Sequence, residues 1–243
     1  MTVPNLFTTV NLFSGFLSVV LAVSGRYAAA AWLIFMASVF DGLDGRIARA
    51  SGKHSEFGIQ MDSLADVISA GIAPSILIYE YHLNQVGTHV AVGLLLAFLP
   101  LLFATFRLAR YNVMTHQHGH QIDYSGMPAP MAATTLGSIV VLHTHTEWAF
   151  LLRFLIIMTP LISLAMASNL NYDGLPNFNI KERGKNRVKL MVMLIGILFV
   201  FIFPEYTFFT FMMVYFLSGP FRFVRSLFSH REHPLPESSK NES

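Results

Sequence analysis

Long apolar stretches recur along the whole chain, and they limit the folds open to it more than any other feature. Each is close to the roughly 20 residues that a helix needs to cross about 30 Å of hydrocarbon. Most are apolar on all sides, whereas helices of soluble proteins keep a polar face. We expect helices at 5–24, 27–49, 62–81, 88–112, 128–143, 148–168, 188–203 and 205–221. The pattern predicts an all-α integral membrane protein with a bundle of about eight transmembrane helices.

The composition agrees with a membrane protein. Of the 243 residues, 53% are hydrophobic and only 12% are charged, whereas about a quarter of a soluble domain is charged. The chain has no cysteine, which excludes disulfides, thiolate metal sites and a cysteine nucleophile. Pro204, Gly219 and Pro220 interrupt the last segments, so six or seven spans are the alternative.

The positively charged residues are predicted to lie mainly on one side of the membrane. Of the 16 lysines and arginines, all but Arg26 and Arg153 fall on the side of the amino terminus, which the positive-inside rule places in the cytoplasm. The first segment lacks the basic region and cleavage site of a signal peptide, so we expect it to stay as a membrane helix. We expect a transmembrane domain over 1–229 in the cell's inner (plasma) membrane, with a disordered cytoplasmic tail at 230–243.

Four acidic residues lie where a membrane helix should have none. Asp41 and Asp44 are spaced i,i+3, and Asp62 and Asp66 are spaced i,i+4, so each pair shares one helix face. A carboxylate near hydrocarbon costs about 2.5–3.5 kcal/mol on insertion scales, so the four need compensating charge. Carboxylates without cysteine or histidine form a hard oxygen site that suits Mg²⁺, Mn²⁺ or Ca²⁺.

The charges indicate two such ions. Two divalent cations balance four carboxylates and leave coordination positions for a diphosphate, an arrangement suited to displacement at phosphorus. In a purely structural protein the aspartates would only cap helices and pair with nearby cations. In a divalent-cation transporter, the alternative from another class, they would form the transport site. All four, however, lie toward one face of the membrane.

The spacing of these residues matches a family signature. The pattern is Asp41-x2-Asp44-Gly45-x2-Ala48-Arg49-x8-Gly58-x3-Asp62-x3-Asp66, and it resembles, without departure, that of the CDP-alcohol phosphotransferase family of membrane enzymes. The resemblance implies a six-helix core with the active site at the cytoplasmic end. It also implies group transfer from a CDP-linked donor to an alcohol, with release of CMP.

The resemblance assigns roles to single residues. Asp41, Asp44, Asp62 and Asp66 would hold two divalent metals, and Asp66 would accept a proton. A homodimer is also implied. The residues that would contact the CDP-lipid are Asn5, Thr8, Gly45, Ala48, Arg49, Ser55 and Gly58.

Three further segments, 106–112, 125–130 and 166–170, are similar to the phosphatidylserine synthase branch of this family. That branch implies CDP-diacylglycerol and L-serine as substrates. Met127 and Ala129 depart from it, because leucine and serine are favoured there.

An acceptor with a carboxylate needs a cation. Arg107 and Arg110 share one helix face and could bind that carboxylate or a lipid phosphate, or they could only anchor the helix at the membrane surface. Asn112 and Ser125 could add hydrogen bonds or cap helices.

Other charged segments leave alternatives open. A phosphorylated acceptor such as glycerol 3-phosphate or inositol phosphate would use the basic run 181–189, which otherwise contacts anionic headgroups. His116, His118 and His120 form a solvated loop or a transition-metal site. We expect membrane lipids, and no nucleic acid, as further partners.

Overall fold

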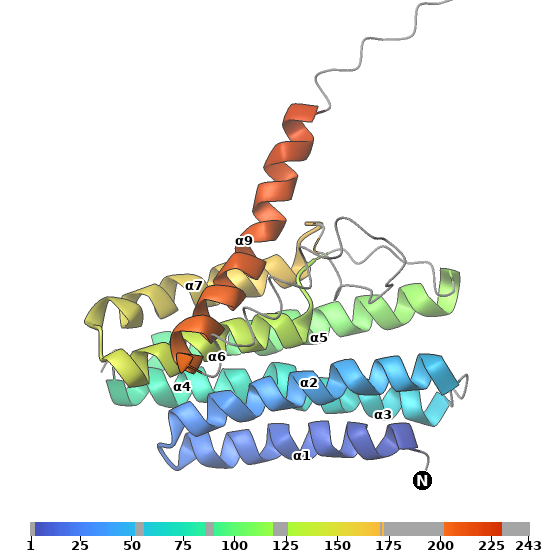
Figure 1. The fold of residues 1–243 in the computed structure, drawn as a ribbon, viewed down its shortest axis with the longest axis horizontal. Helices are drawn as coiled ribbons and strands as arrows, with labels where there is room; N and C mark the ends of the chain where they lie inside the picture. Colours follow the sequence, from blue (N-terminus) through green and yellow to red (C-terminus); the bar gives the residue numbers. More distant parts are fainter. Residues whose placement is uncertain are drawn as a thin grey trace, which may run out of the picture.

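The computed structural model describes residues 3–51, 56–85, 90–118, 126–170, 172 and 202–229. Every regular element within these ranges is a helix (Figure 1). The elements are α1 (Val3–Val23), α2 (Tyr27–Ser51), α3 (Glu56–Asp66), the π-helical η1 (Val67–Ile72), α4 (Ala73–Gln85), α5 (Val90–His118), α6 (Ala129–Thr146), α7 (Ala149–Ala167) and α9 (Pro204–Ser229).

Within the described residues, six helices are long and apolar enough to span a membrane, so the prediction of an all-helical membrane protein is confirmed in that coarser form. The six spans are Leu6–Val23, Tyr27–Gly45, Glu56–Gln85, Val90–Met114, Ala149–Ala167 and Pro204–Arg225. The eight predicted spans are not confirmed. Residues 188–201 of the predicted helix at 188–203 lie outside the described residues, and α6 is not among the six.

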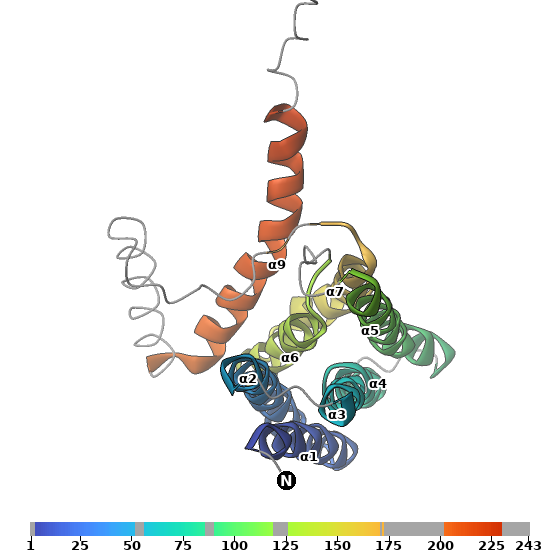
Figure 2. The same ribbon diagram turned by 90° about the vertical axis from the view of Figure 1, so that its right-hand side faces the viewer.

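Helix α6 occupies the centre of the bundle, where it contacts α2, α4, α5, α7 and α9 (Figure 2). It carries buried Thr134, Thr135 and Ser138 in addition to its apolar residues. Each of these hydroxyls donates to a main-chain carbonyl three or four residues earlier, which removes the cost of burying it. The neighbouring helices bury most of α6, and α6 thus forms the middle of the core.

Several helices extend beyond their predicted ends. Helix α5 continues to His118, so His116 and His118, which were predicted in a loop, lie on a helix. The predicted helix 62–81 runs without interruption from Glu56 to Gln85 through α3, η1 and α4. Helix α9 continues through Gly219 and Pro220, so the expected break there is wrong. Its first part packs on the bundle and its last part extends away from it (Figures 1 and 2).

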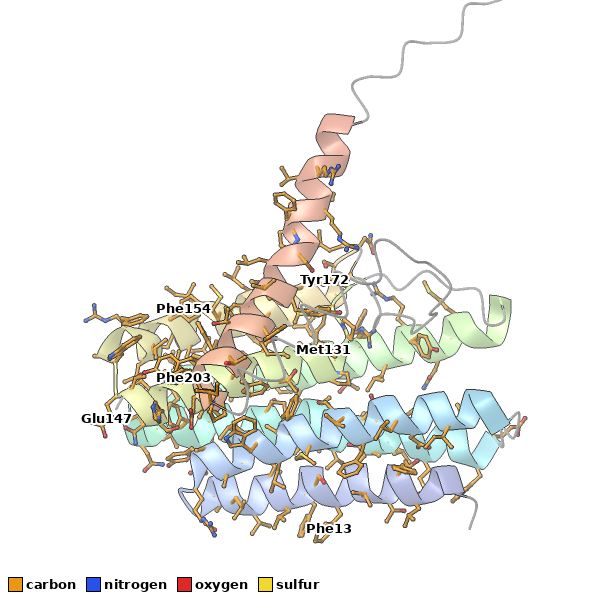
Figure 3. The ribbon with its side chains drawn as sticks, in the orientation of Figure 1. Phe13, Met131, Glu147, Phe154, Tyr172 and Phe203 are labelled. Atoms are coloured by element: carbon orange, nitrogen blue, oxygen red, sulfur yellow. The ribbon has the colours of Figure 1, made fainter. Side chains whose placement is uncertain are left out.

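The outer surface of the bundle is apolar. The side chain of Phe13 on α1, for example, points outward from the bundle and is 60% exposed (Figure 3). Residues of this kind suit contact with lipid chains. Four polar residues of α1, Thr8, Asn11, Ser14 and Ser18, are instead buried. Thr8 and Asn11 lie toward the end of the bundle where α1 begins and α2 ends.

Candidate active site

Two neighbouring helices bring aspartates together at this end of the bundle. Helix α2 carries Asp41 and Asp44, and α3 carries Asp62 and Asp66. One carboxylate oxygen from each of Asp41, Asp62 and Asp66 lies within 4.8 Å of the others. Asp44 is 4% exposed and Asp66 is 8% exposed. The structure thus joins three of the four predicted ligands in one cluster, and the fourth is buried one helical turn from Asp41.

Two of these carboxylates have an uncompensated oxygen. Oδ1 of Asp44 and Oδ1 of Asp62 are buried and have no hydrogen-bond partner within the described part of the chain. Burying an ionised carboxylate without a partner costs several kcal/mol, so such groups pair with a cation. Carboxylate oxygens are the ligands that hard divalent cations prefer. The residues present therefore fit a divalent metal ion.

Helix α1 orients the aspartates through hydrogen bonds. The Thr8 hydroxyl donates to Oδ2 of Asp44, and the Asn11 amide donates to Oδ1 of Asp66 over 3.1 Å. Hydrogen bonds of this kind fix the direction of a ligating carboxylate. The two donors are three residues apart and therefore lie on one face of α1.

Asn11 is a site residue that the sequence interpretation missed. A signal was present: Thr8, Asn11, Ser14, Gly15 and Ser18 recur at helical spacing within an apolar helix, and all five are buried. Polar residues in a membrane helix face the bundle interior and mark functional sites. This stripe could have identified α1 as the third wall of the site.

Helix α5 adds a positive charge beside the cluster. Arg107 interacts electrostatically with Asp66, and its buried Nε has no hydrogen-bond partner among the described residues. Further along the helix, the Asn112 amide donates to the Ser63 hydroxyl over 3.1 Å. Ser63 follows Asp62 directly, so α5 is tied to the helix that carries two of the aspartates.

The segment before α6 and the end of α7 meet through main-chain hydrogen bonds. The Gly126 N–H donates to the Leu170 carbonyl, and the Met127 N–H donates to the Ala165 carbonyl, both over 2.9 Å. Gly126 has a φ of +86°, and a Cβ there would lie 2.4 Å from the Met166 carbonyl oxygen. Only glycine fits this contact.

Arg110 connects this junction to α5, because its Nη1 donates to the Ala167 carbonyl over 3.4 Å. The three segments that resemble the phosphatidylserine synthase branch therefore converge in space, although they lie far apart in the sequence. They meet on the side of the aspartate cluster where Arg107 lies.

The model of the CDP-alcohol phosphatidyltransferase family matches residues 1–167. The chain belongs to this family. The matched residues hold all four aspartates and helices α1 to α7. Members of the CDP-alcohol phosphatidyltransferase family use divalent metal ions, in agreement with the acidic cluster.

The chain is similar to several proteins whose names describe serine phosphatidyltransferases or archaetidylserine synthases. It is 35% identical over 229 residues to the CDP-diacylglycerol–serine O-phosphatidyltransferase of Helicobacter pylori, covering 91% of this chain and 90% of that protein. It is 37% identical over 178 residues to the archaetidylserine synthase of Methanothermobacter thermautotrophicus, covering 71% of each. These relatives confirm the resemblance to the phosphatidylserine synthase branch.

The structure covers only part of the predicted CDP-lipid contacts. Thr8, Gly45 and Gly58 lie on the three helices that carry the site. The side chains of Asn5, Ala48, Arg49, His116 and His118, and the whole of Ser55, His120, Ser125 and 181–189, lie outside the described residues. The roles of all these residues stay predictions.

Proposed function

We propose that the chain transfers the phosphatidyl group of CDP-diacylglycerol to the hydroxyl of L-serine and forms phosphatidylserine and CMP. The observation that carries this proposal is the cluster of Asp41, Asp62 and Asp66 beside Arg107, on a chain of this family. The printed names of the relatives support serine as the acceptor.

In the proposed step, the serine hydroxyl oxygen attacks the phosphorus that carries diacylglycerol, and the bond from that phosphorus to the CMP oxygen breaks. Asp66 accepts the hydroxyl proton, since an alcohol is a weak nucleophile at neutral pH and needs a positioned base. The Asn11 amide holds one oxygen of that base in place. A single displacement needs no covalent intermediate on the enzyme.

Asp41, Asp44, Asp62 and Asp66 would hold two divalent cations, Mg²⁺ or Mn²⁺, with Ca²⁺ as an alternative. Bound there, these ions would neutralise the diphosphate and the charge that develops on the leaving group. Thr8 keeps Asp44 directed toward the site through its hydrogen bond. The cytidine and diphosphate would contact the predicted set on α1, α2 and the linker to α3, in which Arg49 offers a donor fork to phosphate.

The acceptor would bind on the side of α5. Arg107 has the positive charge that a carboxylate needs, and its buried Nε has no hydrogen-bond partner among the described residues. Arg110, Asn112 and Ser125 complete the predicted set. Arg110 and Asn112 also hold the neighbouring segments in place, so substitution of either would disturb the shape of this pocket as well as its charge.

The active site and both termini would face the cytoplasm, because the cations lie predominantly on that side. Residues 1–229 would form the catalytic domain of a homodimer in the inner (plasma) membrane. Serine and CMP are water-soluble, so a site on the cytoplasmic face gives both of them direct access.

An acceptor panel tests the proposal. Purified protein in detergent receives CDP-diacylglycerol and Mn²⁺ with one labelled acceptor at a time: serine, glycerol 3-phosphate or inositol phosphate. We expect label in lipid from serine, with an equal amount of CMP. Label from glycerol 3-phosphate alone would indicate a different acceptor within the family. Metal flux into liposomes without CMP release would indicate a transporter.

A further inference from the structure

The side chain of Asn11 on α1 has two polar ends, and only one of them has a partner. Its amide nitrogen donates to Oδ1 of Asp66 over 3.1 Å. Its own oxygen, Oδ1, is buried and has no hydrogen-bond partner within the described part of the chain. The residue is 0% exposed, so bulk water does not satisfy this oxygen. A buried amide oxygen that lacks a donor is costly, which indicates that something else binds it.

Unsatisfied buried atoms gather at this one place in the molecule. The described residues hold four buried side-chain polar atoms without a hydrogen-bond partner. Three are oxygens of Asn11, Asp44 and Asp62, which lie on α1, α2 and α3. The fourth is Nε of Arg107, which therefore does not donate to Asn11. Three oxygens that approach from three helices and lack donors are typical of a cation site.

The contact between Asn11 and Asp66 supports the same conclusion. Each side chain carries two polar atoms on one carbon, and the hydrogen bond uses one atom of each. When an amide and a carboxylate pair side by side, the two remaining oxygens face each other. They repel one another unless a cation or a proton lies between them. The carboxylate of Asp66 already belongs to the cluster with Asp41 and Asp62.

The charge of the site favours a neutral ligand at this position. The four aspartates already balance two divalent cations, and the diphosphate of the donor would add more negative charge. Asparagine carbonyl oxygens bind hard divalent cations as carboxylate oxygens do. An asparagine therefore completes the coordination without repelling the diphosphate, which a further aspartate would do.

We propose that the side-chain oxygen of Asn11 is a further ligand of the divalent cation that Asp66 would hold. The inference rests on the proposed function and goes beyond the aspartate pattern, because it makes α1 part of the metal site. The two ends of the amide then have different tasks. The nitrogen orients Asp66, and the oxygen binds the cation.

Spectroscopy of bound Mn²⁺ tests this contact directly. Wild-type protein made with ¹³C-labelled asparagine and purified in detergent receives Mn²⁺ without lipid, and electron–nuclear double resonance then detects labelled carbon next to the metal. We expect a coupling to asparagine carbon that disappears in Asn11→Asp, which has no label at this position. Bound Mn²⁺ without the coupling, or a coupling that persists in Asn11→Asp, would overturn the inference. A wild-type protein that binds no Mn²⁺ would overturn the metal site of the proposed function, and the ligand role with it.

Mn²⁺ titration of two variants separates the ends of the amide. Asn11→Leu removes both polar atoms at similar size, so we expect the Mn²⁺ affinity to fall about tenfold or more. Asn11→Asp loses the donor but keeps an oxygen, so its affinity should stay closer to that of the wild type. Equal losses in the two variants would overturn the ligand role, because the loss of the donor to Asp66 would then explain both. The thermal unfolding midpoint checks that each variant is folded.

Asn84→Leu is the matched control, because it makes the same change on the helix that carries Asp66, about five turns away. Asn84 is exposed, and its amide donates to the Glu80 carbonyl over 2.8 Å. Its variant should bind Mn²⁺ as the wild type does. An equal fall in Asn84→Leu and Asn11→Leu would overturn a specific role for Asn11. Unchanged Mn²⁺ affinity in Asn11→Leu, with normal serine transfer by the wild type, would overturn the ligand role and leave the proposed function in place.

Discussion

At the scale of single residues, the aspartates of the site differ in their polar neighbours. Asn11 donates to Asp66 and Thr8 donates to Asp44, both from α1, while Oδ1 of Asp62 has no partner among the described residues. Because the three environments differ, substitutions can separate proton transfer from metal binding.

Asp66→Asn should lose turnover and keep substrate binding. The amide preserves the shape of the side chain but cannot accept the proton, so we expect kcat to fall by at least about 10²-fold. The KM for CDP-diacylglycerol should change little, because the other aspartates remain. CMP release at several substrate concentrations gives both values. Wild-type kcat in this variant would show that another group is the base.

Thr8→Val removes the hydroxyl that donates to Asp44. Loss of a partner that orients a ligand weakens metal affinity by about tenfold or more, and Mn²⁺ titration in the absence of lipid would measure this. Thr105→Val is the control, because Thr105 is exposed and its hydroxyl contacts only its own helix at the Leu101 carbonyl in the described structure. Equal Mn²⁺ affinity in the two variants would contradict an orienting role for Thr8.

The aspartates could be predicted from the sequence. The polar stripe of α1 could have marked that helix, but it could not have identified Asn11 as the residue that donates to Asp66. Four acids at i,i+3 and i,i+4 spacing in apolar segments are conspicuous because ionised groups are rare in a membrane. Asn11 is uncharged and is one of several polar residues in α1, so it has less contrast. Its role depends on the packing of α1 against α3, which spacing within one helix does not reveal.

At the scale of elements, close approach between α1 and η1 keeps the donors beside the aspartates. A Cβ at Gly15 would lie 2.8 Å from the Cα of Ser69, which is backbone and cannot move aside cheaply. At Gly137 the nearest atom would be 3.4 Å away, an ordinary contact with Ala31. The two glycines therefore differ in how much space they leave for a side chain.

Gly15→Ala should lower both the thermal unfolding midpoint and the turnover. Alanine gains about 1 kcal/mol in helix propensity over glycine, but overpacking costs about 1–3 kcal/mol and shifts Asn11 away from Asp66. Gly137→Ala should unfold at the same or a higher temperature with normal turnover. A Gly15→Ala protein as stable and active as the wild type would contradict the close packing of α1.

The sequence predicted which segments form membrane-spanning helices, but it predicted the ends and local irregularities of these helices less well. Length and apolarity identified most spans, yet η1 lies inside a predicted helix, and a single π turn has no periodic signal of its own. Pro220 suggested a break in α9, but the helix continues through it. Proline removes one main-chain hydrogen bond, and α9 tolerates that loss at this position.

At the scale of the whole molecule, the sequence predicts most lysines and arginines on the side of the amino terminus, and the structure brings three aspartates together in one cluster. This distribution was readable in the sequence, because a membrane leaves few places for charge. The convergence of three distant segments at Arg110 and Gly126 was not readable, since it depends on how α5, α6 and α7 pack together.

Removal of metal should stop the reaction and loosen the fold. Without a cation the clustered carboxylates repel one another, so a chelator should abolish CMP release and lower the unfolding midpoint. Mn²⁺ or Mg²⁺ should restore both, because a ligand that binds only the folded state stabilises it. CMP release that is unchanged after chelation would contradict a metal-dependent site.

The most direct test of the central claim is to measure phosphatidylserine and CMP in the same reaction, for the wild type and for Asp62→Asn. Asp62 belongs to the cluster, and its Oδ1 has no partner in the described residues, so its loss should affect metal binding before anything else. We predict equal amounts of both products from the wild type and neither from a folded Asp62→Asn protein. Serine incorporation at the wild-type rate by this variant, or CMP release without phosphatidylserine, would contradict the proposed transfer at the aspartate cluster.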